Sequence, residues 1–129
     1  MRIALCSVHV TDPVAAHVFY TGTLGFTSVM AVPEVELFIV RSPDTEEGPG
    51  LMLEPSDNPV ALAYREGLYA QGVPTIVFGV DDVAAEYERL AAAGARLTGP
   101  PTTDLSGTHV TLDDTCGNWV QLHQPTAAG

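Results

Sequence analysis

The chain contains one short pattern twice, and this repeat constrains the fold more than any other feature. The segments "VTDPVAAH" and "VDDVAAEY" begin at Val10 and Val80, 70 residues apart. Each combines the end of an apolar stretch with the start of an amphipathic one. Only two copies fit into 129 residues, which indicates a duplicated half and not a solenoid of many repeats.

Both copies carry the signals that begin and end a helix. Asp12 and Asp82 can accept hydrogen bonds from the free N–H groups of a first turn, and Pro13 is tolerated at the first helical position. Gly25 and Gly94 follow at nearly the same distance and allow the left-handed conformation that ends many helices. We therefore expect one helix in each half.

Turn-forming residues divide the rest of each half into strands. The expected strands are residues 26–32, 35–41 and 50–55 in the first half, and 95–98, 107–113 and 117–123 in the second. The segment between the halves, "DNPVALAYREGLYAQG", has its own cap and a glycine near its end. We predict an α+β fold in one domain, 1–129, with a βαβββ module at 1–57, a second at 74–125, and a linker helix at 58–73. Since neither half can cover both faces of its sheet, the two sheets are expected to curve around a concave cavity.

Charge and composition restrict the partners. The net charge is −11 with only five lysines and arginines, which argues against nucleic acid and fits either a solvated surface or a cationic partner. No apolar run reaches the roughly 18 residues that cross a bilayer, and the N-terminal stretch reads as a first strand and not as a signal peptide. Cys6 and Cys116 have no CxxC spacing, so we expect reduced thiols and a cytoplasmic location.

Strand alternation predicts which side chains face the cavity. Val8, Val10, Leu51 and Leu53, together with Ala4 and Cys6, are expected to face the first helix, and Ile76, Phe78, Val120 and Leu122 are their counterparts in the second half. The side chains expected on the concave face are Leu5, Ser7, His9, Glu36, Phe38, Val40, Met52, Glu54, Thr75, Val77, His109, Thr111, Trp119, Gln121 and His123.

Two stretches together resemble a known family. "VTDPVAAHVFYTGTLGF" and "DDTCGNWVQLHQP" are similar to the vicinal oxygen chelate superfamily, which includes glyoxalase I, extradiol dioxygenases, fosfomycin-modifying enzymes and bleomycin-binding resistance proteins. The resemblance covers nearly the whole chain. It implies paired βαβββ modules around a concave site, and a homodimer that shares or swaps modules.

The resemblance also implies positions for a divalent metal, one on the first and one on the last strand of each module. These positions carry over to Leu5, Glu54, Thr75 and Gln121. Leu5 cannot bind a metal and Gln121 is a weak neutral ligand, so we expect no metal and no other cofactor. The alternative is a displaced site for Zn, Ni, Fe or Mn.

Several polar and aromatic residues are candidates for chemistry in the cavity. Glu54, His123 and His9 are the catalytic candidates, because a carboxylate and an imidazole can exchange a proton. The candidates for ligand contact are Trp119, Phe38, Glu54, Gln121, Met52, Ser7, Thr75 and His109. Aromatic rings beside carboxylates suit a flat or cationic ligand.

Three functions remain open from the sequence. The first is a small-molecule-binding protein without a metal, of the drug-binding or resistance type, with an aromatic or cationic ligand. The second is a glyoxalase- or dioxygenase-type enzyme, acting as a lyase, isomerase or oxygenase on a small oxygenated substrate. The third is a dimeric interaction module with a vestigial cavity.

Overall fold

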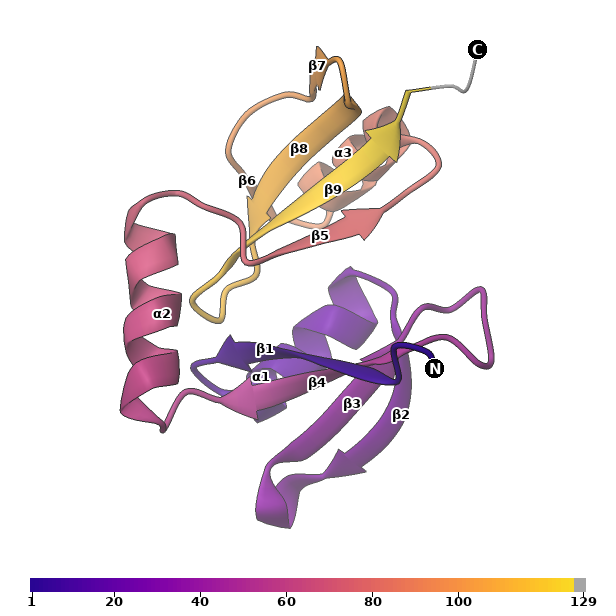
Figure 1. Ribbon diagram of the computed structural model, residues 1–129. Helices are drawn as coiled ribbons and strands as arrows, with labels where there is room; N and C mark the ends of the chain where they lie inside the picture. Colours follow the sequence, from indigo (N-terminus) through magenta and orange to yellow (C-terminus); the bar gives the residue numbers. More distant parts are fainter. Residues whose placement is uncertain (127–129) are drawn as a thin grey trace.

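The computed structural model describes residues 1–126, and Figure 1 shows two small sheets that lie side by side, each with a helix packed on it. The first sheet has the strand order β1-β4-β3-β2, with β1 and β4 parallel and the other pairs antiparallel. The elements of this first module are β1 (Leu5–Val10), α1 (Pro13–Val18), the π-helical turn η1 (Phe19–Thr23), β2 (Thr27–Val32), the 3-10 turn η2 (Pro33–Val35), β3 (Leu37–Arg41) and β4 (Gly50–Pro55).

The second sheet repeats the arrangement in the order β5-β9-β8-β6. Its module consists of β5 (Ile76–Gly79), α3 (Val83–Ala92), β6 (Arg96–Leu97), β7 (Thr102–Asp104), β8 (Gly107–Asp113) and β9 (Trp119–Pro125). The strand β7, which we expected to be loop, pairs with the start of β8, where Thr103 lies opposite Thr108. Between the modules stands α2 (Pro59–Ala70). The α+β fold with two βαβββ modules is confirmed, and no helix of residues 1–126 is long and apolar enough to cross a membrane.

The helices begin where the capping residues predict. The Asp12 carboxylate accepts hydrogen bonds from the backbone N–H groups of Val14 and Ala15 at 3.1 and 3.3 Å, and Asp82 accepts from that of Ala85 at 3.1 Å. The repeated sequence pattern is therefore a repeated structural device that directs each helix onto its sheet.

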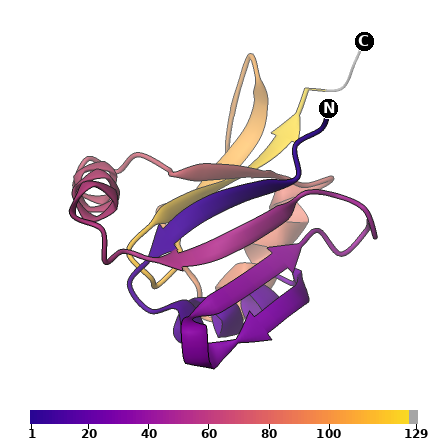
Figure 2. The same cartoon turned by 60° about the horizontal axis from the view of Figure 1, so that its bottom comes forward.

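The helices α1 and α3 lie on the same side of the two sheets, as Figure 2 shows. The predicted core positions Val8, Val10, Leu51, Leu53, Val120 and Leu122 are buried on this side. Ala4 and Cys6 are exposed, so their predicted burial is wrong. The reason is that α1 is only six residues long and packs on β3 and β4. The opposite side, which we call the helix-free face, carries the alternate residues of the strands, and α2 stands at one end of it.

The two modules meet along a seam between β1 and β5, which are edge strands of separate sheets and run in opposite directions (Figure 1). Four partly buried side chains pack against the hydrophobic cores of both modules: Phe19, Leu24, Ile76 and Phe78. Apolar contacts therefore join the two halves within one chain.

Hydrogen bonds close the α2 end of the seam, and the turn at residues 113–118 supplies most of them. The buried carboxylate of Asp114 accepts from the Tyr20 hydroxyl at 2.7 Å and from the Asn118 side-chain amide at 3.0 Å. It also accepts from the backbone N–H groups of Cys116 and Asn118. The Thr11 backbone N–H donates to the Cys116 carbonyl at 3.0 Å. This turn of the second module is thus bonded directly to the first module.

Burial shifts the ionisation of these groups. Burial, followed by the charge and hydrogen bond of Asp114, raises the pKa of Tyr20 well above its usual value. Burial also raises the pKa of Asp114, although the hydrogen bonds that it accepts oppose the rise. The pKa of the Cys116 thiol is raised to about 11, by burial first and then by the nearby Asp114 charge. The same desolvation therefore acts on all three side chains.

Candidate functional site

The centre of the helix-free face is formed by two equivalent strand pairs. Ser7 lies opposite Met52 in the first sheet, and Val77 lies opposite Gln121 in the second. Leu5 and Val77 are 46% and 55% exposed. The centre of this face therefore combines the apolar side chains of Leu5, Met52 and Val77 with the polar ones of Ser7 and Gln121.

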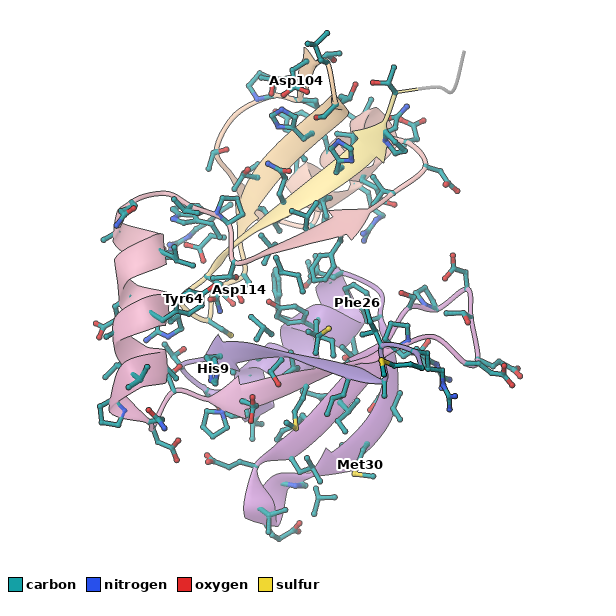
Figure 3. The ribbon with its side chains drawn as sticks, viewed as in Figure 1. His9, Phe26, Met30, Tyr64, Asp104 and Asp114 are labelled. Carbon is teal, nitrogen blue, oxygen red and sulfur yellow. The ribbon has the colours of Figure 1, made fainter. Side chains whose placement is uncertain are left out.

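The end of this face next to α2 is polar. His9 lies opposite Glu54 across the parallel strands β1 and β4, and its Nε2 atom is 4.0 Å from the Glu54 carboxylate. Beside His9 is a cavity of about 50 Å³, which Ser7, Tyr64 and Thr75 also line. Figure 3 shows His9 and Tyr64 together at this end. This pocket brings together Ser7, His9 and Thr75, three of the residues that the sequence predicts in the site.

Two polar atoms in the wall of this pocket have no partner. His9 Nδ1 and Asn118 Oδ1 are buried, yet neither makes a hydrogen bond within residues 1–126. The orientation of the Asn118 amide is defined, because its nitrogen donates to the His9 carbonyl at 2.8 Å and to Asp114 at 3.0 Å. Buried polar atoms without a partner are uncommon in native proteins and indicate a place for a water molecule or a ligand group.

Trp119 is held by α2. Its ring stacks on Tyr69, with the centroids 5.0 Å apart, and its indole N–H donates to the Tyr69 carbonyl at 3.0 Å. The Tyr69 hydroxyl in turn donates to Asp113 at 2.6 Å, and this hydrogen bond raises the pKa of Tyr69. One face of the indole is therefore occupied by protein, and half-buried Trp119 connects the sheet to α2.

The predicted position of Phe38 on the concave face is wrong, as is that of Val40. Phe38 and Val40 are 2% and 0% exposed and belong to the core under α1, where the Phe38 ring lies 5.1 Å from that of His17. Ile39 lies opposite Met52, so odd residues of β3 share a face with even residues of β4. Glu36 precedes β3 in the left-handed conformation.

The histidines of the second sheet lie elsewhere. His109 and His123 face each other across β8 and β9, at the end marked by Asp104 in Figure 3. His109 Nε2 is 3.0 Å from the Asp104 carboxylate, and His123 Nε2 is 3.3 Å from the Ser106 hydroxyl. The Ser106 hydroxyl and backbone N–H, with His109, hold the pKa of Asp104 well below its usual value. Of the two histidines that are catalytic candidates, His9 and not His123 is the one beside Glu54.

Comparison with known proteins assigns this fold. The family model of the Glyoxalase/Bleomycin resistance protein/Dioxygenase superfamily matches residues 2–122. The chain belongs to this superfamily. The uncharacterized protein YurT of Bacillus subtilis (strain 168) is 38% identical to it over 126 residues, which cover 96% of this chain and 99% of that protein.

Solved structures agree with this membership. UcmS2 is 27% identical, with 95% of this chain and 97% of that chain covered and a TM-score of 0.78. TnmS3, an antibiotic binding protein from Streptomyces sp. CB03234, is 25% identical, with 98% and 97% covered and a TM-score of 0.76. The similarity extends over both modules in each case.

The metal positions that the superfamily implies do not form a suitable donor set here. Glu54 lies opposite His9, and Gln121 lies opposite Val77. Val77 is the equivalent of Ser7 and not of His9, so Glu54 and Gln121 do not occupy equivalent positions in the two modules. Leu5 approaches Gly50, its partner on β4, and has no donor atom. Residues 1–126 contain no group of three or more His, Cys, Asp or Glu side chains that could hold a metal ion. A divalent site of the superfamily type, with three or four protein ligands, does not fit these residues.

Sequence reasoning missed the role of Asp114 and Asn118. The segment "DDTCGN" reads as a tight surface turn, but both side chains are almost fully buried. The available signal was Tyr20. It lies on the apolar side of a predicted amphipathic helix, and a tyrosine hydroxyl needs a hydrogen-bond partner when its ring is buried in the protein core. Only the packing of the two modules shows that the partner comes from the other half of the chain.

Proposed function

We propose that the protein binds a small amphipathic organic molecule on the helix-free face, without a metal, as a drug-binding or resistance-type member of its superfamily. The observation that carries the proposal is the pair of unpartnered atoms, His9 Nδ1 and Asn118 Oδ1, at one end of an uncovered apolar surface. A ligand hydroxyl would donate to Asn118 Oδ1 and accept from His9 Nδ1–H, while the apolar body of the ligand covers Leu5 and Val77. The likeness to TnmS3, which is an antibiotic binding protein, supports this class of ligand.

Other expected contacts belong to the same proposal. Met52, Gln121, Thr75 and Ser7 would contact the ligand between the polar end and the centre of the face, and His109 would contact it further along β8. Trp119 would contact the ligand with the face that Tyr69 leaves free. We also propose a homodimer, since a second copy would enclose the exposed side chains of this face, and a cytoplasmic location, for which two free cysteines are typical.

Fluorescence titration tests the binding proposal, because Trp119 is the single tryptophan. We expect members of a panel of hydroxyl-bearing antibiotics to shift its emission and to raise the melting temperature. Val77→Asp should weaken that binding by at least tenfold, since it places a charge in the apolar contact. The control Val60→Asp makes the same change at an exposed site on α2 and should not alter it. A panel that shifts neither emission nor melting temperature would contradict the proposal.

The contact between His9 and Glu54 favours a second candidate, an enzyme that moves a proton on a small oxygenated substrate. Glu54 would be the base or acid, with His9 beside it. Elemental analysis of protein purified without chelator separates this candidate from a metalloenzyme. A stoichiometric Zn, Ni, Fe or Mn content that Glu54→Ala removes would overturn metal-free binding.

A further inference from the structure

A second and larger cavity lies on the helix side of the seam, at the end away from α2. Its volume is about 440 Å³, within the range of roughly 300–1,000 Å³ typical of small-molecule sites. Phe26, Phe78 and Leu24 contribute apolar surface to it, and the two phenylalanine rings meet edge to face with centroids 4.8 Å apart. Figure 3 shows Phe26 between the two modules. We call this cavity the seam cleft.

The duplication explains why the seam cleft lies at this end of the seam. Tyr20 and Leu90 are 70 residues apart and occupy equivalent positions of the repeat. At the α2 end, Tyr20 extends its hydroxyl to Asp114, and the 113–118 turn fills the space between the modules. At the other end, the Leu90 side chain cannot make an equivalent hydrogen bond. The corresponding loop, residues 42–49, remains largely exposed at the side of the cleft.

The rim of the seam cleft is acidic. Asp44, Asp81, Asp82 and Glu86 line it, and Arg89 is the single basic residue among its lining side chains. The Arg89 guanidinium is already engaged, because it contacts Glu86 at 2.7 Å and donates to the Thr23 carbonyl at 2.8 Å. Within residues 1–126, Asp44 and Asp81 have no ion-pair partner. Their negative charge is thus available to an incoming ligand.

We propose that the seam cleft is a binding site for an organic cation with an aromatic or alkyl body. The apolar body would displace water from Phe26, Phe78 and Leu24, and the positive charge would lie near Asp44 and Asp81. The ring faces of the phenylalanines add cation–π attraction. The net charge of −11 raises the local concentration of cations around the whole molecule. This site lies on the opposite side of the sheets from the helix-free face and does not depend on the function proposed there.

Isothermal titration with two probes of equal shape and opposite charge tests the site. We expect tetraphenylphosphonium to bind and tetraphenylborate, in a sodium buffer, to bind at least tenfold more weakly. Variants of two neighbouring residues of β5 then show on which side the cation binds. Phe78 faces the cleft, whereas Val77 faces the helix-free face. Phe78→Leu should weaken binding of the cation by about threefold to tenfold through loss of the ring. Val77→Thr should leave it unchanged.

Rim variants give a measurement that does not depend on the packing of Phe78. The double variant Asp44→Asn/Asp81→Asn changes only exposed side chains and should weaken cation binding by about fivefold at low salt. The control Glu34→Gln/Asp57→Asn removes the same amount of negative charge from sites outside the cleft. It should weaken cation binding by less than about twofold. Equal binding of both probes, equal effects of the two double variants, or weakening by Val77→Thr and not by Phe78→Leu would each overturn the proposal.

Discussion

The two loops that connect the last two strands of each module occupy equivalent places in the repeat but have become different structures. Residues 114–118 join β8 to β9, and their side chains and backbone are bonded to Tyr20, Thr11 and His9 of the first module. Residues 42–49 join β3 to β4, are longer by three residues, and remain mostly exposed. The fold therefore provides two equivalent ends of one seam, and the loop sequences decide which end is closed and which holds a cleft.

The largest effect is expected from removing the buried carboxylate of the closed end. Asp114→Ala leaves the Tyr20 hydroxyl, two backbone N–H groups and one of the two N–H bonds of the Asn118 amide without an acceptor. It should lower the free energy of unfolding by about 3–5 kcal/mol in a urea titration. Asp44→Ala makes the same change in the other loop and should cost less than about 0.5 kcal/mol. Similar losses in both variants would show that the two loops do not differ in this way.

A smaller loss is expected from adding one methyl group to the same turn. Gly117 has a φ of +91°, and a Cβ there would overlap the Arg65 guanidinium, which donates to the Gly117 carbonyl. Gly117→Ala should therefore lower the free energy of unfolding by about 2 kcal/mol or more. Gly22→Ala is the matched control, because nothing lies within 4 Å of its added Cβ. If the two variants unfold at the same urea concentration, the turn is not as tightly packed as described.

The smallest effect concerns pH and the buried thiol of the closed end. The pKa of Cys116 is about 11 in the folded chain, above its usual value near 9. The unfolded chain therefore loses this proton first as pH rises, and this one thiol lowers the stability by about 2 kcal/mol between pH 9 and 11. Cys116→Ala should remove that part of the fall, whereas Cys6→Ser should retain it.

Thiol labelling gives an independent reading of the same cysteine. At pH 8 we expect Ellman's reagent to modify one thiol per native chain, the exposed Cys6, and both thiols in urea. Rapid modification of two thiols in the native protein would show that the 113–118 turn opens readily.

Much of the fold could be predicted because its signals are local. The caps Asp12 and Asp82 and the apolar alternation of β1, β5 and β9 each depend on a few neighbouring residues. The face of β3 could not be predicted, since it depends on the register that the loop at 42–49 sets with β4. A shift of one residue in that register turns Phe38 from the cavity into the core.

The candidate site was predictable only in part. Alternation placed Ser7, His9 and Glu54 on the same face, but the partner of Glu54 depends on the alignment of β1 with β4. The seam cleft has no sequence signal of its own. Two differences between the halves account for it. Leu90 stands where the first half has Tyr20, and the loop at 42–49 is three residues longer than the loop at 114–118.

The solvent-facing connection at 42–49 also makes this molecule a practical scaffold. A fluorophore attached at exposed Glu47, or a small protein inserted after it, would lie in the loop beside the seam cleft while the bonded turn keeps the halves aligned. Binding in the cleft would then change the fluorescence of the label, in a chain of only 129 residues.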